Sequence, residues 1–393
     1  MPPDPSRKEA LRAAGVAEPF LPFARPTIDE ETVAAVAAVL RSGWITTGPQ
    51  VEAFESALSA YFGGRAVRTF TSATGALEVA LQACHIGPGD EVIVPAMTFA
   101  ATANVVLRVG ARPVFVDVDA ATRNLDAGRV QAAITPRTRA VMPVHFAGLP
   151  VDMDPLLDLA QKRGLRVIED AAHAMGASYR ERRIGSFGDF VAFSFHPNKN
   201  LTTIEGGALS IRDHAAVSEV ERLRFHGIER TGDDLDVLEA GGKYNLTDVA
   251  ACVGLGQLRR LEHFNQRRRE LVMRYFDRLT TNPPFELPAR GDAGHSWHLF
   301  APLLPLERIS LGRREFIAEM RIRGIGVGIH FPALHQFSLY RKMGYRAGDF
   351  PNAARIGEST VTLPLFPAMN DNDVDRVCDA CAGIIGGGDR KGR

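Results

Sequence analysis

The sequence has little cysteine: there are four residues in 393, and only Cys378 and Cys381 stand close together. So few cysteines in so long a chain exclude the disulfide framework that stabilises small secreted domains. The CxxC pair has the spacing of a metal or redox site, but no second pair accompanies it, and the apolar residues around it repeat at helical spacing. We therefore interpret both cysteines as core residues of a C-terminal helix, and we expect no metal site.

The sequence also lacks an excess of charge of either sign, because 46 basic residues balance 46 acidic ones. A balanced chain has no overall field that would attract nucleic acid or an anionic membrane surface. Arginines cluster at 259–260 and 267–269, but glutamates and apolar residues at helical spacing interrupt them, which favours a solvated or subunit-facing helix. Any affinity for phosphate must therefore come from a local site, and we expect small-molecule partners and no nucleic acid.

Long hydrophobic runs are missing as well. No window approaches the roughly 20 apolar residues that a membrane-spanning helix needs, and residues 1–17 lack the apolar core of a secretory signal. We therefore expect no membrane partner and a cytoplasmic location.

Short β-rich runs alternate with helical segments through the first part of the chain. A first helix is predicted from a capping box at Thr27 and Glu30 to Gly43. The expected strands are 67–71, 91–94, 113–116, 140–144, 165–169, 190–194 and 207–211, and the expected crossover helices are 75–84, 100–109, 154–163 and 214–224. This alternation predicts an α/β fold with a mostly parallel, seven-stranded sheet covered by helices on both faces.

The pattern changes after about Asp248, where a long charged helical stretch is followed by a proline-rich segment and further strand and helix signals. The chain is also longer than a single hydrophobic core usually allows. We predict a flexible N-terminus over residues 1–20, a large domain over 21–249, a smaller C-terminal α/β domain over 250–387, and a disordered tail over 388–393.

Lys199 lies in the segment FSFHPNKNLTTIEGGAL, residues 193–209, between an apolar strand and the glycines that begin the next strand. An exposed lysine has a pKa near ~10.4 and is mostly protonated at neutral pH. In a tight, partly dry turn at the end of a strand, where open α/β sheets bind their ligands, a lysine can stay neutral enough to attack a carbonyl. A solvated loop lysine is the ordinary alternative, but this placement favours covalent amine chemistry.

This segment resembles the lysine segment of the DegT/DnrJ/EryC1/StrS family of pyridoxal-phosphate-dependent aminotransferases, which act on nucleotide-linked keto sugars. The likeness runs from about residue 20 to residue 380. Four further segments, RSGWITTGPQ (41–50), VIEDAAHAMGA (167–177), KYNLTD (243–248) and RGIGVGIHF (323–331), look most like the branch that makes UDP-4-amino-4-deoxy-L-arabinose. The resemblance implies the aspartate-aminotransferase-like fold, called fold type I, with pyridoxal 5'-phosphate bound by the large domain.

The residues that match the family motifs supply each group that the cofactor needs. Lys199 corresponds to the catalytic lysine. Thr74 and Gly75 lie in a turn before a helix, where backbone N–H groups and hydroxyls would hold the phosphate. Asp170 follows an apolar strand, and burying its carboxylate is costly without a cation such as the protonated ring nitrogen. The other cofactor-binding positions are Phe99 against the ring face, His173 near the ring oxygen, Ser194 as a second phosphate donor, and Asn245.

In the family, the residue at Asn245 reaches the phosphate of the neighbouring subunit, so the resemblance implies a homodimer whose active sites are shared across the interface. It also implies L-glutamate as the amino donor and the C4 ketone of a UDP-linked keto sugar, of the UDP-4-keto-L-arabinose type, as the acceptor. Lys199 would move a proton at the donor Cα as base and then as acid.

The acceptor side is the part that the sequence leaves most open. The substrate-binding candidates are Lys243, Tyr244 and His330, with Trp44, Thr46, Thr47 and Phe331 in the same segments. Each is equally well explained by packing. One departure from the family is Ile204, where relatives commonly have a smaller residue. His145 matches a family position whose role the sequence does not give.

Other functions remain as alternatives. The closest is an aminotransferase for a UDP-4-keto-6-deoxy amino sugar, which would use the same cofactor residues. A dehydratase of the family would have histidine in place of Lys199, and a regulator that binds the cofactor without turnover would be expected to lack Lys199 or Asp170. Both residues are present.

Overall fold

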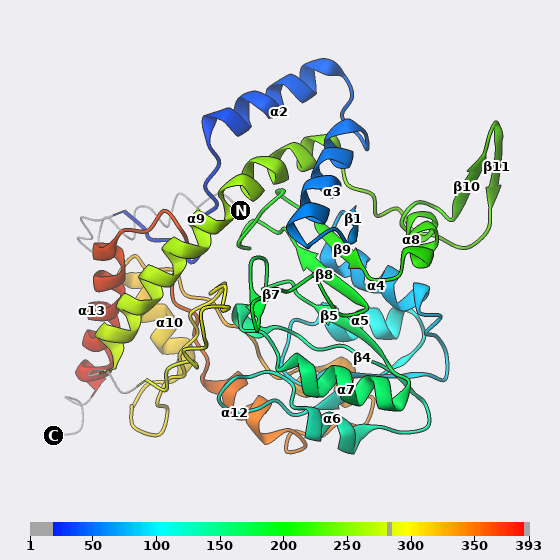
Figure 1. The fold of residues 1–393 in the computed structure, drawn as a ribbon. Coiled ribbons are helices and arrows are strands. Elements are labelled where there is room, and N and C mark those ends of the chain that lie inside the picture. Colours follow the sequence, from blue (N-terminus) through cyan, green and yellow to red (C-terminus); the bar gives the residue numbers. More distant parts are fainter. Residues whose placement is uncertain (1–18, 281–284, 389–393) are drawn as a thin grey trace.

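The computed structural model describes residues 19–280 and 285–388 of the chain (Figure 1). Its centre is a seven-stranded sheet with the strand order β1-β9-β8-β5-β4-β2-β3. The strands are β1 Ala66–Phe70, β2 Glu91–Pro95, β3 Arg112–Val116, β4 Thr138–Val141, β5 Arg166–Asp170, β8 Phe190–Ser194 and β9 Gly207–Ile211. All neighbours pair in parallel except β9, which runs antiparallel to both β1 and β8. The predicted α/β class and mostly parallel sheet are therefore confirmed.

Helices cover both faces of this sheet. The helices are α2 Glu30–Ser42, α3 Pro49–Tyr61, α4 Ala73–Ala83, α5 Ala101–Arg108, α6 Ala127–Ala133, α7 Met153–Arg163, α8 Val217–Arg224, α9 Asp248–Leu279, α10 Arg313–Ile322, α11 Ser338–Arg341, α12 Pro351–Ser359 and α13 Asp371–Gly388. Successive strand residues point to opposite faces. Accordingly, Ile168 of β5 joins the core cluster that contains α4, α5 and α8, whereas Val167 joins the cluster that contains α3, α6 and α7.

Helix α9 connects the sheet region with the C-terminal region. It packs against α2 and α3, and also against α13. The predicted boundary between the large and the small domain, between residues 249 and 250, falls within the first turn of α9. The C-terminal region has a third core cluster, which contains Cys378 and Cys381 of α13. Both cysteines are buried and unpaired, which confirms their interpretation as helix core.

Several local predictions need correction. The first helix is capped by Asp29, whose Oδ1 accepts the amide N–H of Thr32 at 2.9 Å, and not by Thr27. Strand β4 ends at Val141, because the chain then leaves the ladder and Val144 forms only an isolated bridge with Asp170. Helix α13 continues through Gly388, so the first residue of the predicted tail is helical, and residues 389–393 lie outside the described residues. The same is true of residues 1–18 of the predicted flexible N-terminus.

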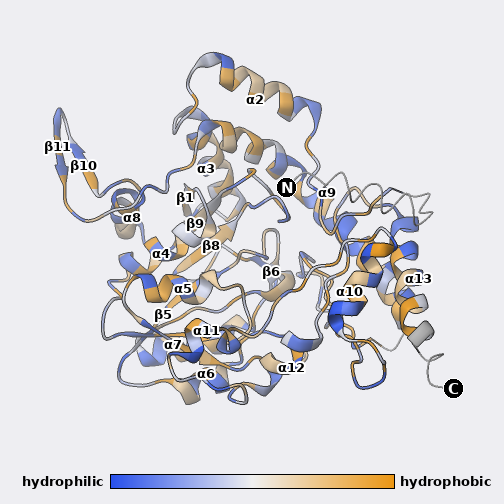
Figure 2. Ribbon diagram, turned by 180° about the vertical axis from the view of Figure 1, so that it is seen from behind, coloured by the Kyte–Doolittle hydropathy of each residue, from blue (hydrophilic) through white to orange (hydrophobic). Residues whose placement is uncertain are grey.

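The sequence reasoning missed α3, α6 and two short hairpins, β6 Ser178–Tyr179 with β7 Arg182–Arg183 and β10 Ile228–Thr231 with β11 Asp234–Val237. The β10–β11 hairpin extends away from the rest of the molecule (Figures 1 and 2). Its residues Leu235 and Val237 are more than half exposed. No helix within the described residues is long and apolar enough to cross a membrane.

Candidate active site

A pocket of about 300 Å³ opens where β5 and β8 end and where α4 and α5 begin. Nineteen residues line it, and nine of them carry the chemistry considered below: Thr74, Thr98, Phe99, Asp170, His173, Ser194, Lys199, His330 and Phe331. The carboxyl ends of parallel strands are the usual ligand-binding edge of an α/β sheet. The predicted residues Thr74, Phe99, Asp170, His173, Ser194, Lys199 and His330 are thus brought together in one cavity.

Lys199 stands in the turn that follows β8, and its backbone N–H donates to the carbonyl of His196 at 2.9 Å. Burial lowers the pKa of the Lys199 ammonium from 10.5 to about 8, although the nearby Asp170 carboxylate acts in the opposite direction. A substantial fraction of this amine is therefore neutral near physiological pH. A neutral amine at the floor of a pocket is the nucleophile that covalent attachment of an aldehyde requires.

Asp170 is the last residue of β5 and is 5% exposed. One of its oxygens accepts the Thr102 hydroxyl at 2.7 Å, and the other accepts the Ala172 amide at 3.1 Å. Burial raises the pKa of the Asp170 carboxyl, while the two hydrogen bonds and the charge of Lys199 oppose that rise. A cation placed in the pocket would offset the cost of burying this carboxylate.

Glu169 points to the opposite face of β5, as strand alternation requires. Its Oε2 lies 3.0 Å from His145 Nε2, and both side chains are fully buried. The Val151 amide donates to His145 Nδ1, so a neutral His145 ring has its proton on Nε2 and donates it to Glu169. His145, whose role the sequence left open, is therefore the hydrogen-bond partner of Glu169 behind the pocket.

The N-terminus of α4 forms another wall of the pocket. Ser72 caps this helix by accepting the Gly75 amide at 3.1 Å, and Thr74 faces the cavity. The first amide groups of a helix have no intrahelical acceptor, which makes such an end suitable for an anion. Gly207 of β9 allows this end to lie against the sheet, because a Cβ there would be 2.5 Å from the Ala73 nitrogen and 2.7 Å from the Phe193 carbonyl oxygen.

Aromatic rings form the remaining walls. Phe99 is 59% exposed, and its ring lies 5.9 Å from that of Phe331, which in turn stacks on His173 at 5.7 Å. Burial lowers the pKa of His173 well below its usual value, so the ring is neutral. Since His173 Nδ1 accepts the Ala147 amide at 3.2 Å, its proton is on Nε2, which can donate to an oxygen in the pocket.

These groups fit pyridoxal phosphate as the sequence resemblance implies. The N-terminus of α4 suits the phosphate, the buried Asp170 lacks a paired cation among the described side chains and suits a protonated ring nitrogen, and the exposed face of Phe99 suits the ring. Lys199 provides the amine. Each of the four requirements is met by a separate structural element.

The structure does not bring every predicted residue to the pocket of its own chain. Gly75 does not line the pocket. Its backbone N–H donates to the Ser72 hydroxyl oxygen, and a Cβ at this position would lie 2.9 Å from a ring carbon of Tyr244. Lys243 is exposed and donates to Asn245 Oδ1, and Asn245 Nδ2 donates to Thr47. Within a single chain, Lys243, Tyr244 and Asn245 therefore lie outside the cavity that contains Lys199.

Sequence reasoning missed two residues that act on the predicted ones. The Thr102 hydroxyl donates to Asp170, and its oxygen lies 2.9 Å from that of Thr98. No sequence motif distinguishes these two threonines from others in the chain. The one available signal was that they stand four residues apart just after a predicted strand. His298 packs 4.4 Å from the His173 ring and contacts Asn200 Oδ1 at 3.2 Å. It comes from a distant part of the chain, so only the folded structure shows its position.

The chain matches the model of the DegT/DnrJ/EryC1/StrS aminotransferase family over residues 26–382, a range that includes every residue lining the pocket. Three solved structures illustrate the likeness. Spr1654 from Streptococcus pneumoniae, in its PLP form, is 33% identical with a TM-score of 0.87, and the match covers 94% of this chain and 99% of that one. DesV of S. venezuelae is 36% identical with a TM-score of 0.85, covering 92% and 98%. DesI, solved in the presence of its TDP-sugar product, is 30% identical with a TM-score of 0.87, covering 96% of each chain.

Proposed function

Because the chain belongs to the DegT/DnrJ/EryC1/StrS aminotransferase family and is a pyridoxal-phosphate-dependent sugar aminotransferase, we propose that it transfers the amino group of L-glutamate to the C4 ketone of a UDP-linked keto sugar. The acceptor that we propose is of the UDP-4-keto-L-arabinose type, and the product would serve the synthesis of cell-surface polysaccharide. The observation that carries the chemistry is the buried Lys199 amine beside the buried Asp170 carboxylate.

The residues of the pocket divide the work of the reaction. When bound, the cofactor supplies the carbonyl that carries the amino group and a ring that accepts the electrons of the donor Cα–H bond. Lys199 Nζ would take the proton from the donor Cα as a base and deliver it as an acid to the cofactor carbon that receives the amino group, a role that a pKa of about 8 suits. Asp170 would keep the ring nitrogen protonated, and His173 Nε2 would donate to the ring oxygen. Thr74 and Ser194 would hold the phosphate.

The proposed attachment point can be tested by chemical trapping. Borohydride reduction of the yellow holoenzyme should fix pyridoxyl label on the peptide that contains Lys199, and Lys199→Ala protein should take up no covalent label. Label on another peptide, or turnover by the Lys199→Ala variant, would refute the role that we give to Lys199.

The acceptor needs a separate test, because the cofactor residues do not distinguish one keto sugar from another. Release of 2-oxoglutarate from glutamate should be followed with UDP-4-keto-L-arabinose, with a UDP-4-keto-6-deoxy amino sugar, and with TDP-linked counterparts. We expect the highest kcat/KM with UDP-4-keto-L-arabinose. A higher value with a 6-deoxy acceptor or with a TDP-sugar would replace the substrate that we propose but would leave the aminotransferase chemistry unchanged.

We also propose that the enzyme is a homodimer in which Asn245 reaches the partner's cofactor phosphate. Two features support this. Lys243, Tyr244 and Asn245 lie six to eight residues after the end of the β10–β11 hairpin, which extends from the molecule with Leu235 and Val237 exposed. An isolated two-stranded hairpin is marginally stable in water, so a surface of a second copy would stabilise it.

Mixing two inactive variants tests this arrangement. If Asn245 acts across the interface, a mixed dimer of Lys199→Ala and Asn245→Ala chains has one intact site, so random mixing should restore about a quarter of the wild-type activity. If Asn245 acts in its own subunit, neither site of the mixed dimer is intact and no activity returns.

A cytoplasmic location is a further proposal, supported by the four unpaired cysteines, which suit a reducing compartment.

A further inference from the structure

A small second cavity, which we call the side cavity, adjoins the catalytic pocket. Arg25, Lys199 and Arg268 line it, and none of the described residues in its lining is acidic. Asn198 and Lys199 line both the side cavity and the catalytic pocket, so the two spaces meet at the reactive amine. The side cavity measures about 10 Å³, so a ligand larger than water would lie at its mouth and not inside it.

Arg268 is a fixed charge in the wall of the side cavity. It is 2% exposed, and its Nη1 donates to the carbonyl oxygens of Leu365 at 2.9 Å and His298 at 3.2 Å. Burial lowers the pKa of the Arg268 guanidinium to about 10, so the group is still charged at neutral pH. Arg268 therefore makes the side cavity electropositive, but its hydrogen bonds hold it in place and it cannot turn toward a ligand.

Arg25 is the exposed arginine of the lining, and the segment around it is fastened on both sides. The ring of Phe23 stacks on that of His330, with 5.2 Å between the ring centres, and His330 lines the catalytic pocket. On the other side, Gln257 Nε2 donates to the carbonyl oxygen of Thr27 at 2.7 Å. Arg25 is thus held at the mouth of the side cavity, two residues from a ring that packs on the wall of the catalytic pocket.

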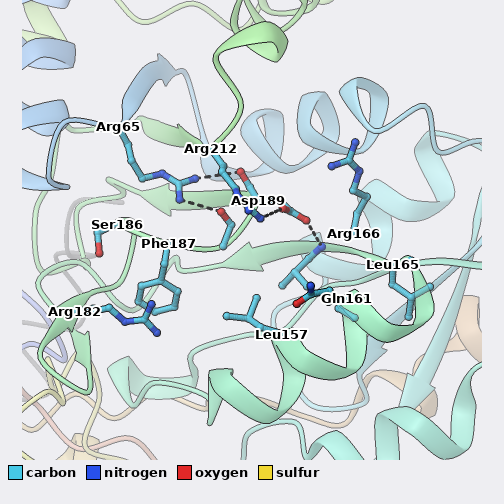
Figure 3. Close-up of a pocket in the computed structure, with 14 residues that line it drawn as sticks. Arg65, Leu157, Gln161, Leu165, Arg166, Arg182, Ser186, Phe187, Asp189 and Arg212 are labelled. Carbon is cyan, nitrogen blue, oxygen red and sulfur yellow. Dashed lines mark hydrogen bonds and ion pairs between the residues drawn. The ribbon is translucent and has the colours of Figure 1, made fainter.

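The charge of Arg25 has no counterpart among the described residues, with which its side chain forms no hydrogen bond or ion pair. The large cavity at the start of β5, drawn in Figure 3, shows the contrast. There Arg212 lies 3.3 Å from Asp189, and Arg182 lies 3.3 Å from Asp154. Carboxylates of the chain balance those two arginines, whereas Arg25 remains available to an anion from outside.

The amino donor brings such an anion to this place. L-Glutamate has two carboxylates, and Lys199 cannot neutralise either of them while it acts as a base, because a base must be uncharged. No arginine lines the catalytic pocket itself. A guanidinium suits a carboxylate because its planar group can donate to both oxygens at once. Asn198 offers a second donor, since its Oδ1 lies 2.8 Å from His196 Nδ1 and its Nδ2 can turn to a ligand.

We propose that Arg25 binds a carboxylate of the amino donor, with Asn198 as a second donor and the buried charge of Arg268 behind them. The inference rests on the proposed function, because it takes L-glutamate as the donor. The exposed position of Arg25 at the mouth suits the side-chain carboxylate, which lies further from the reacting carbon than the α-carboxylate does.

The half-reaction with the donor tests the proposal. Single-turnover release of 2-oxoglutarate by the holoenzyme should be measured against glutamate concentration for Arg25→Gln, for Arg25→Lys, and for Arg314→Gln, which removes an exposed arginine of α10 as the control. Loss of one charge-assisted contact should lower kcat/KM for glutamate about 10- to 100-fold in Arg25→Gln. Arg25→Lys should recover part of this loss, and the control should match the wild type.

A binding measurement gives a readout that does not depend on turnover. Glutarate, a dicarboxylate without an amino group, should be titrated into each holoenzyme in a calorimeter at constant ionic strength. Its dissociation constant should rise about tenfold or more in Arg25→Gln and stay unchanged in the control. Because the Arg25 side chain has no hydrogen bond or ion pair with the rest of the described chain, both of its variants should fold.

The donor and the half-reaction distinguish the outcomes. A loss with L-glutamate but not with L-alanine would support the proposal and identify the side-chain carboxylate, and equal losses with both would support it and identify the α-carboxylate. Unchanged glutamate kinetics in Arg25→Gln, or a loss confined to the half-reaction with the keto sugar, would overturn it. Absence of 2-oxoglutarate release by the wild type would refute the proposed function itself, which is a different result.

Discussion

Replacement of Asp170 by asparagine should separate the electrostatic role of this residue from its structural role. The side chain keeps its size, and its hydrogen bonds can be kept: Oδ1 can still accept the Ala172 amide, and an amide NH₂ can donate to Thr102, whose hydroxyl can then turn toward Thr98 at 2.9 Å. Only the negative charge is lost. Removing one partner of a buried ion pair costs about 3–5 kcal/mol, so the half-reaction with glutamate should slow by about 10²- to 10⁴-fold.

The assay is single-turnover release of 2-oxoglutarate from glutamate by the holoenzyme. Glu169→Gln is the matched control, because it neutralises the adjacent carboxylate of the same strand, on the face away from the pocket, while its carbonyl can still accept from His145. We expect this control to remain within a few-fold of the wild type. The reasoning would be refuted if Asp170→Asn retained nearly full activity, or if Glu169→Gln lost as much activity as Asp170→Asn.

Three further predictions concern reactivity and stability. In cofactor-free protein, the rate at which Lys199 takes up pyridoxal phosphate, followed by absorbance, should rise as the pH passes about 8, because the buried amine is protonated below that value; an onset near 10 would contradict the lowered pKa. Gly207→Ala should lower the free energy of unfolding by about 1–3 kcal/mol and weaken cofactor binding, because its Cβ would lie 2.5 Å from the backbone nitrogen of Ala73. Gly383→Ala in α13 is the control: open space surrounds it, so thermal unfolding should show no loss of stability. Ile204→Gly should stabilise the protein by about 1 kcal/mol, since Ile204 is a β-branched residue at φ 74°; a lower melting temperature would show that its side chain makes a compensating contact.

The sequence was sufficient to predict the sheet, because each of its strands is a short apolar run between turn residues, and burial on both faces makes that pattern clear. Helix α3 was missed because only Val51, Phe54 and Leu58 of its residues are buried, a narrow stripe in a segment that begins with Gly-Pro. The pocket residues that belong to family motifs, such as Asp170 and Lys199, could be predicted from the sequence. Thr102 could not, because a threonine in a helix acquires its role only from the carboxylate that the fold places beside it. The position of Asn245 outside the pocket of its own chain likewise depends on tertiary structure.

The two acidic neighbours at the end of β5 make the register of this strand unusually strict. Asp170 faces the cofactor side, where Thr102 donates to it, and Glu169 faces the other layer, where His145 donates to it. Sliding the strand by one position would turn each acid toward the other layer, and only the acid that took its neighbour's place would meet a donor there, because the second acid would lie one position beyond Thr102 or His145. Mispairing would therefore leave a buried carboxylate without its donor, in addition to disturbing the apolar packing, and this cost disfavours misfolded alignments at the place where the catalytic groups assemble.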